Sequence, residues 1–369
     1  MNIRALLFGS AAALIVASGA NAADAVMAPE PEPVEYVRVC DAYGAGFFYI
    51  PGTETCLQIS GYVWYQIGAT NWRNGGDTYD YEGQSHTFAY AGTPLNGEGW
   101  FKNIEARVNF DARSETEWGT LRSYIRMAAS WNGVGDGPVN LQQAVIQLGG
   151  FLIGYTETLW ADGWDSSVSN WASHSWSGMS YGWGRRARIQ YSFSSNGFLA
   201  ALSLEDDALA GDGYMPDVVG KLAYDGSWGG VWVKAAYDES DDSFAAQLGA
   251  QINIPNMAGS SLRVIGYYSE TTTNTYGVQY DAGLPLPNTA AAEWSILGSY
   301  NHQFSEKFSA SIGAQYFSGH GTLPNSWLGE LSVVWLPITN FEVRGELGYA
   351  KTENFDGTMS GFLRFTRYF

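Results

Sequence analysis

The sequence predicts an all-β protein, a 16-stranded antiparallel transmembrane β-barrel. Many short segments alternate apolar and polar residues with period two, as two-faced strands do. These segments number sixteen, and single-chain barrels of bacterial outer membranes have an even number of strands. Their connections are alternately short and long, which is typical of the periplasmic turns and external loops of such barrels.

The first 22 residues (1–22) are predicted to be a cleaved signal peptide. Arg4 supplies a positive charge, an apolar stretch follows from Ala5 to Gly19, and Ala20-Asn21-Ala22 gives a small-x-small cleavage pattern. The apolar stretch is too short, and too rich in Ala, Ser and Gly, to stay in a membrane as a helix. We therefore expect cleavage after Ala22 and export of the mature chain.

The composition fits an exported barrel. The chain contains 45 glycines, 15% aromatic residues and only 15% charged residues, whereas soluble domains have about 25% charged residues. A large secreted β-protein such as a lectin could share these totals. The net charge of -18 argues against nucleic acid as a partner. It favours acidic external loops and a pore with a mild preference for cations.

Residues 23–56 are expected to form a Pro/Glu-rich N-terminal segment that ends in a small stapled element, before the barrel domain at 57–369. Cys40 and Cys56 are the only cysteines, and an isolated pair in an exported protein predicts one disulfide. Metal binding is the weaker alternative, since no histidine lies nearby to complete a ligand set. We predict no metal site and no cofactor.

The strand pattern is clear in the first segment of the barrel. Leu57, Ile59 and Val63 share one face, whereas Gln58 and Ser60 share the other. The same alternation places the sixteen strands near 57–68, 100–110, 119–131, 139–148, 151–155, 185–194, 197–205, 217–225, 230–238, 243–254, 261–271, 291–304, 307–317, 326–336, 341–350 and 358–369.

The connections give an independent check of this count. Those after even-numbered strands are short, for example Gly149-Gly150 and Ser195-Asn196. Several after odd-numbered strands are long, at about 69–99, 156–184 and 272–290. This parity puts both ends of the barrel on the periplasmic side, and a β-sandwich does not predict it.

Two terminal segments resemble a known family. The run from Val34 to Leu57, VEYVRVCDAYGAGFFYIPGTETCL, is similar to the start of alphaproteobacterial porins of the rhizobial type, and the Arg-Tyr-Phe ending is similar too. The third residue from the end, usually apolar in outer-membrane barrels, is here Arg367. The resemblance implies a homotrimer of 16-stranded barrels, each with its own pore narrowed by an inward-folded third loop. It implies nothing about solute preference, because the external loops diverge.

The third external loop, about 156–184, corresponds by position to the loop that narrows the pore of general porins. Its carboxylates Glu157, Asp162 and Asp165 are therefore candidates for the acidic side of the constriction. A barrel of this size without an internal loop leaves a wide channel, which favours this interpretation. The alternative is a solvated acidic loop outside the barrel.

The opposite wall of the pore is predicted to be basic. The strand register turns seven arginines toward the lumen, where facing carboxylates would create a transverse field that orients dipolar solutes. The alternative is that some of them only pair with neighbouring acids, as Arg344 can with Glu342 or Glu346. The seven candidates are Arg107, Arg122, Arg126, Arg186, Arg188, Arg344 and Arg364.

Other motifs are weaker. Residues 178–182 (GMSYG) match a G-x-S-x-G nucleophile pattern with His174 nearby, but that motif needs a strand before it and a helix after it. We therefore predict no enzyme. Two acidic segments, 206–217 and 238–242, are either solvated or bridged by divalent cations to lipopolysaccharide.

The sequence as a whole predicts a general-diffusion porin of the bacterial outer membrane. Small hydrophilic solutes and ions would pass through it, and its lasting partners would be its own copies, outer-membrane lipid and lipopolysaccharide. Two rivals remain open at this point. One is a channel specific for a solute such as a sugar, and the other is a surface barrel with a plugged lumen.

Overall fold

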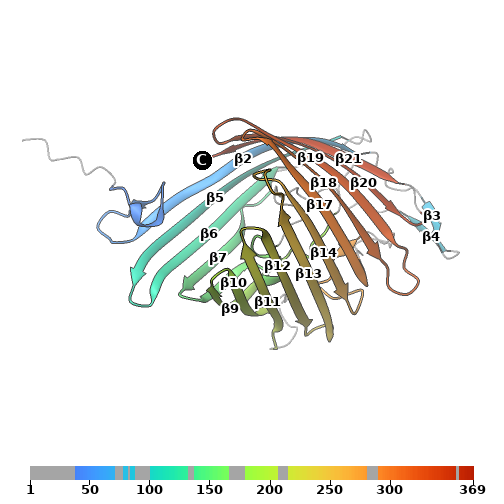
Figure 1. Cartoon of the computed structure of the whole chain (residues 1–369), viewed down its shortest axis with the longest axis horizontal. Coiled ribbons are helices and arrows are strands. Elements are labelled where there is room, and N and C mark those ends of the chain that lie inside the picture. Colours follow the sequence, from blue (N-terminus) through green and yellow to red (C-terminus); the bar gives the residue numbers. More distant parts are fainter. Residues whose placement is uncertain are drawn as a thin grey trace, which may run out of the picture. The chain divides into compact units, whose positions relative to one another are not determined.

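Sixteen antiparallel strands pair in chain order, and the last pairs with the first, so that the sheet closes on itself. The closing ladder runs from Tyr62↔Tyr368 to Thr70↔Ser360. Figure 1 shows the strands side by side in chain order from β2 to β21. The predicted 16-stranded barrel is confirmed. Its strands are β2 (Cys56–Thr70), β5 (Trp100–Thr116), β6 (Gly119–Trp131), β7 (Asn140–Leu148), β8 (Phe151–Glu157), β9 (Arg185–Ser195), β10 (Phe198–Asp206), β11 (Asp217–Gly226), β12 (Gly229–Asp238), β13 (Ser243–Asn253), β14 (Ser261–Ser269), β17 (Trp294–Ser305), β18 (Phe308–Ser318), β19 (Ser326–Ile338), β20 (Phe341–Thr352) and β21 (Thr358–Tyr368).

The computed structural model does not describe the whole chain. The predicted signal peptide and residues 23–37 lie outside the described residues, so the boundaries proposed there stay predictions. Among the described residues, no helix is long and apolar enough to cross a membrane. The described ranges are 38–70, 78–81, 84–87, 100–131, 137–165, 179–206, 215–280, 290–354 and 357–369.

Short elements lie outside the barrel ladder. They are the 3-10 helices η2 (Asp41–Tyr43) and η3 (Leu159–Ala161), and the short strands β1 (Phe48–Tyr49), β3 (Thr78–Tyr81), β4 (Gln84–Thr87), β15 (Gln279–Tyr280) and β16 (Ala290–Ala291). Strands β15 and β16 pair with each other, as do β3 and β4. Strand β1 pairs with the start of β2.

Side chains alternate between the two faces of the barrel wall. On β14, Leu262 and Val264 are about half exposed, whereas Arg263 and Ile265 are buried. An apolar outer face is required where strands meet acyl chains, since a charge there is costly. The inner face is less uniform than expected, because Ile265 and Phe317 point inward and join a buried apolar cluster.

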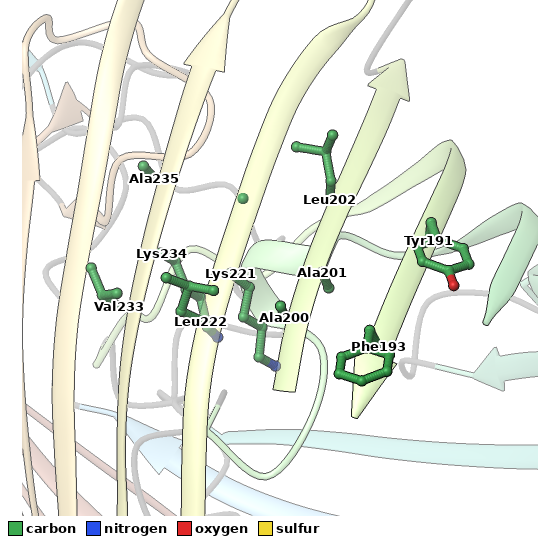
Figure 2. Close-up of a pocket in the computed structure, with 11 residues that line it drawn as sticks. Tyr191, Phe193, Ala200, Ala201, Leu202, Lys221, Leu222, Val233, Lys234 and Ala235 are labelled. Atoms are coloured by element: carbon green, nitrogen blue, oxygen red, sulfur yellow. The ribbon is translucent and has the colours of Figure 1, made fainter. Parts of the chain in front are cut away.

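A shallow apolar recess marks the outer face of β9 to β12 (Figure 2). Its floor includes Ala200, Gly220 and Ala235, and larger residues such as Tyr191 and Leu222 surround them. The small side chains account for the hollow, since their neighbours rise above them. The recess belongs to the outer face of the wall and not to the lumen.

The turns at one end of the barrel are tight. Between β9 and β10, Asn196 and Gly197 both have positive φ, 50° and 85°, as a two-residue type I′ hairpin turn requires. This turn lies one residue later than predicted. At the same end, Cys40 and Cys56 form a disulfide with a Cα–Cα distance of 6.0 Å. The disulfide staples the segment with η2 and β1 to the first residue of β2.

Two of the long connections fold against the inner wall. We name them loop 3 (residues 158–184, described at 158–165 and 179–184) and loop 6 (residues 270–293, described at 270–280 and 290–293). Leu159 and Trp160 of loop 3 and Tyr276 of loop 6 belong to the same buried cluster as inward-facing residues of the wall. Loop 6 was predicted only as an external loop, and its inward course was missed.

Candidate functional site

Loop 3 begins with a hydrogen-bonded turn on the inner wall. The backbone N–H of Leu159 donates to Oε1 of Glu205 on β10 at 2.8 Å, and the hydroxyl of Thr158 donates to the other carboxylate oxygen. Thr158 also caps η3 by accepting from the N–H of Trp160. Glu205 is fully buried, and a buried carboxylate needs such donors. One inward side chain thus fixes where loop 3 leaves the wall.

Two lysines hold the next part of loop 3. Nζ of Lys221 on β11 lies 2.7 Å from Oδ1 of Asp165, and Nζ of Lys234 on β12 lies 3.5 Å from the same atom. Lys234 also donates to the carbonyl of Trp160 at 2.8 Å. We call Lys221, Lys234 and Asp165 the lysine latch. Arg263 on β14 adds a bond to the carbonyl of Trp164 at 2.8 Å.

Lys221, Lys234 and Arg263 were not among the predicted wall residues. A signal was present, since each occupies an inward position of a correctly placed strand. The predicted basic residues were all arginines on other strands. The inward register of β11, β12 and β14 would have identified all three.

The three predicted loop 3 carboxylates have different surroundings. The side chain of Asp165 is fully buried in the lysine latch, whereas that of Asp162 is 42% exposed and lies 2.6 Å from Nη2 of Arg188. Glu157 is the last residue of β8 and not part of the loop. Its side chain is 26% exposed and lies 3.3 Å from Nη1 of Arg126. Only Glu157 and Asp162 are accessible to water.

Exposure also divides the seven predicted arginines into two groups. The side chains of Arg107, Arg122 and Arg126, on β5 and β6, are 22%, 26% and 20% exposed. Those of the remaining four, on β9, β20 and β21, are buried, namely Arg186, Arg188, Arg344 and Arg364.

The buried arginines bind neighbouring groups of the wall. Arg344 donates to Glu342 at 3.0 Å, which is one of the two pairings left open by the sequence. Arg364 donates to Gln66 and lies over the ring of Trp64, with Cζ 4.6 Å from the centroid. These contacts fit the alternative in which an arginine pairs with its neighbours within the wall.

Another inward arginine, in addition to Arg263, was not predicted. Arg113 on β5 is 28% exposed and shares the carboxylate of Asp111 with Arg122, each with an Nη2 atom 2.8 Å from Oδ2. It was overlooked because β5 was predicted to end at residue 110 and continues to Thr116. We call Arg107, Arg113, Arg122 and Arg126 the arginine wall.

A polar cavity of about 410 Å³ lies between loop 3 and the end of the arginine wall beside the β5–β6 turn. Arg113 and Arg122 line it from the wall, Asp162 lines it from loop 3, and Gln147 and Gln190 lie between them. Guanidinium and carboxylate groups therefore face the same open space.

Tyr181 lies on the returning part of loop 3, at 179–184. Burial and the negative charge of Glu157 raise the pKa of Tyr181 to about 12, so its hydroxyl stays protonated.

The G-x-S-x-G pattern has no nucleophile setting in the described residues. The backbone of Ser180 is bonded to the side-chain amide of Gln315, N–H to Oε1 and Nε2–H to the carbonyl oxygen, each at 2.8 Å. No helix follows Ser180, since β9 begins at Arg185. Gly178 and His174 lie outside the described residues.

A closed barrel with an apolar outer face, a charged interior and an internal loop defines the class of outer-membrane channel proteins. Residues 24–362 match the family model described as "Porin subfamily". The chain belongs to this porin family.

Curated relatives agree with the family. Porin Omp2a of Brucella ovis is 41% identical over 303 residues, which cover 74% of this chain and 80% of the relative. Porin Omp2b of Brucella suis biovar 1 is 42% identical over 299 residues, which cover 74% of this chain and 75% of the relative. The predicted resemblance to alphaproteobacterial porins is confirmed.

Solved structures share the fold at low sequence identity. The outer-membrane channel DcaP of Acinetobacter baumannii has a TM-score of 0.65 at 10% identity, over 87% of this chain and 99% of that one. An anion-selective porin from Comamonas acidovorans has a TM-score of 0.58 at 11% identity, over 86% of this chain and 100% of that one. The protein is a bacterial outer-membrane porin, a member of a family of channels.

Proposed function

We propose that solutes cross this porin along the side of the lumen bounded by the arginine wall, and that Glu157 and Asp162 supply the opposing carboxylates. The observation that carries this proposal is the cavity of about 410 Å³ lined by Arg113, Arg122 and Asp162. Groups of opposite charge across an aqueous gap create a transverse field. Such a field orients dipolar solutes and disfavours apolar ones.

The difference in exposure between the accessible and the buried charged side chains supports this path. A charge in contact with the aqueous path acts directly on a passing ion, whereas the field of a buried charge is largely cancelled by its paired counter-charge. Asp165, Arg186 and Arg188 are buried and engaged in contacts of the wall and loop 3. In this proposal they shape the channel, whereas the accessible residues meet the solute.

The ion selectivity should be weak. Four accessible arginines face at least two accessible carboxylates, while the chain as a whole carries a net charge of -18. The excess negative charge attracts cations toward the mouths of the channel, and the arginine wall opposes their passage. We propose a weak preference for cations in a general-diffusion channel that uses no cofactor.

The remaining partners follow from the family resemblance. We propose that three copies assemble, that lipid and lipopolysaccharide surround the assembly, and that residues 1–22 direct export and are then cleaved. The exposed apolar side chains of the outer face, such as Leu202 and Ile312, support contact with acyl chains.

Planar-bilayer recording of the purified protein tests the proposed function. Stepwise conductance with a small reversal potential under a salt gradient is expected. The absence of steps would support a plugged surface barrel. Saturable block by one sugar would support a specific channel, for which Tyr62 and Tyr124 beside the arginine wall offer stacking surfaces.

A further inference from the structure

Loop 6 is attached to the wall at its base. Its Thr275 donates to Oδ2 of Asp238, from the backbone N–H at 2.8 Å and from the hydroxyl at 2.6 Å. Asn274, fully buried, donates from Nδ2 to the hydroxyl of Ser243 at 2.7 Å. The hydroxyl of Thr271 donates to Asp241. The acidic segment 238–242 thus binds loop 6, a use that its charge pattern alone did not indicate.

The middle of loop 6 reaches the start of loop 3 through one side chain. The hydroxyl of Tyr276 donates to Asp217 at 2.8 Å and lies 3.4 Å from Oε2 of Glu205, the carboxylate that anchors Thr158. The ring of Tyr276 meets that of Trp160 edge-on, with centroids 6.0 Å apart. Tyr276 is fully buried. Glu205 is therefore shared by the two loops.

A buried arginine completes this contact. Cζ of Arg186 lies 4.2 Å from the ring centroid of Tyr276, and its Nη1 lies 3.3 Å from Asp217. The same guanidinium donates to the carbonyl of Thr275 at 3.4 Å. Burial and the neighbouring carboxylates raise the pKa of Tyr276, against the opposing effect of Arg186. The phenol therefore stays protonated and remains a donor.

The returning limb of loop 3 also faces loop 6. A cavity of about 240 Å³ lies between them, lined by Met179 to Trp183 on one side and by Thr275, Gly277 and Gln279 on the other. A Cβ added to Gly182 would lie 3.0 Å from the carbonyl oxygen of Tyr276. Both limbs of loop 3 therefore border loop 6, and the cavity leaves room for one loop to shift against the other.

We propose that Tyr276 is a positioning residue of the channel: through it, loop 6 holds loop 3 against β9–β11, so that two inward-folded loops set the width of the pore. The ring of Tyr276 contacts Trp160 of loop 3 while its hydroxyl bonds Asp217 and approaches Glu205 on the wall, so loosening Tyr276 removes one of the supports of loop 3. The inference rests on the proposed function only in that loop 3 borders the conducting path.

The test compares single-channel currents of Tyr276→Phe with those of the wild type. The variant removes the hydroxyl that fixes the ring to Asp217, so the ring should support Trp160 less firmly and loop 3 should detach more often. We expect a roughly tenfold rise in the time spent in a wider, noisier open state, which corresponds to about 1.4 kcal/mol. Uptake of solutes near the size limit into liposomes should rise as well.

Tyr280→Phe is the matched control. Tyr280 lies on the same loop and its hydroxyl donates to the carbonyl of Pro324 at 2.9 Å, while its ring stacks on Phe317. Its loss removes one buried hydroxyl of loop 6 that bonds the connection between β18 and β19. This control should conduct as the wild type does, and its thermal unfolding should match that of Tyr276→Phe.

The outcomes distinguish the role of Tyr276 from the proposed channel function. If the wild type shows stepwise conductance and both variants behave like it, the role of Tyr276 is overturned while the channel function stands. If both variants become equally noisy, the effect is general loosening of loop 6 and the specific role is likewise overturned. If the wild type does not conduct, the proposed function itself fails.

Discussion

Nζ of Lys221 lies 2.7 Å from Oδ1 of Asp165, and the side chains of both residues are almost completely buried. A pair of this kind is expensive to break, because the partner that remains is a buried charge without compensation. Here the two charges come from different parts of the chain, one from the barrel wall and one from loop 3. The pair therefore fixes the position of loop 3 relative to the barrel wall.

Asp165→Asn should loosen loop 3. The variant leaves Lys221 and Lys234 without their buried counter-charge, which costs about 3–5 kcal/mol when one member of a buried pair is removed. Detachment of residues 159–165 relieves that cost, so single-channel conductance and current noise should both rise.

Asp162→Asn is the control for this change. Asp162 is 42% exposed, so water screens its charge, and its buried partner Arg188 keeps a second carboxylate, with Nη1 3.9 Å from Oε1 of Glu205. Its current should be no noisier than that of the wild type, and the loss of this pore carboxylate should change only the ion selectivity. Equal noise in the two variants, or none in Asp165→Asn, would show that the lysine latch does not hold the loop.

Arg126→Gln should shift selectivity toward cations. Arg126 is 20% exposed and 3.3 Å from Glu157, so its loss removes one positive charge and frees one negative charge at the pore. We expect a roughly two- to threefold rise in the cation-to-anion permeability ratio, measured as reversal potential under a salt gradient.

Lys307→Gln removes the same charge at an exposed turn between β17 and β18. Its reversal potential should equal that of the wild type. A shift as large as that of Arg126→Gln would mean that overall charge, and not the arginine wall, sets selectivity.

The barrel could be predicted from sequence because both of its faces are constrained. A residue that meets lipid must be apolar, so period two persists through the membrane and fixes register, as on β6, whose bounds Gly119–Trp131 match the prediction. The constraint fades near the membrane edges. Beyond Phe110 the chain reads Asp-Ala-Arg-Ser-Glu, and β5 was accordingly ended six residues too early.

The interior of the lumen could not be predicted in the same way. Whether an inward charge meets water or another chain segment depends on which loops fold inside, and loops 3 and 6 carry no periodic pattern. Tyr276 bonds Asp217 across 59 residues of sequence, and Asp165 is buried by lysines on two other strands. Such contacts exist only once the barrel has closed, so residue type alone suggested an exposed acid at Asp165.

Replacing both cysteines, Cys40→Ser with Cys56→Ser, should weaken the stapled element while the barrel still forms. On the chain-entropy model, a disulfide closing a loop of this length contributes about 3 kcal/mol. The element contacts the arginine wall, since Cζ of Arg113 lies 5.0 Å from the ring centroid of Phe47. We expect faster proteolysis between residues 41 and 55 and a modest change in conductance.

The wild type treated with a reductant should behave in the same way. Complete loss of channel activity in the double variant would contradict the separation of the stapled element from the barrel, because it would show that the ladder from β2 onward depends on the disulfide.

Leu222→Arg should impair insertion of the barrel. Leu222 is 60% exposed on the outer face of β11, beside the apolar recess, and an arginine facing the middle of the bilayer costs about 2–4 kcal/mol. Urea titration of protein folded into lipid vesicles should show this loss as a lower unfolding midpoint. Met215→Arg is the control, since Met215 is 58% exposed and precedes β11 at the external end, where the same charge can reach water. Equal stability of the two variants would contradict a lipid-facing position for Leu222, because a side chain in water tolerates arginine at either site.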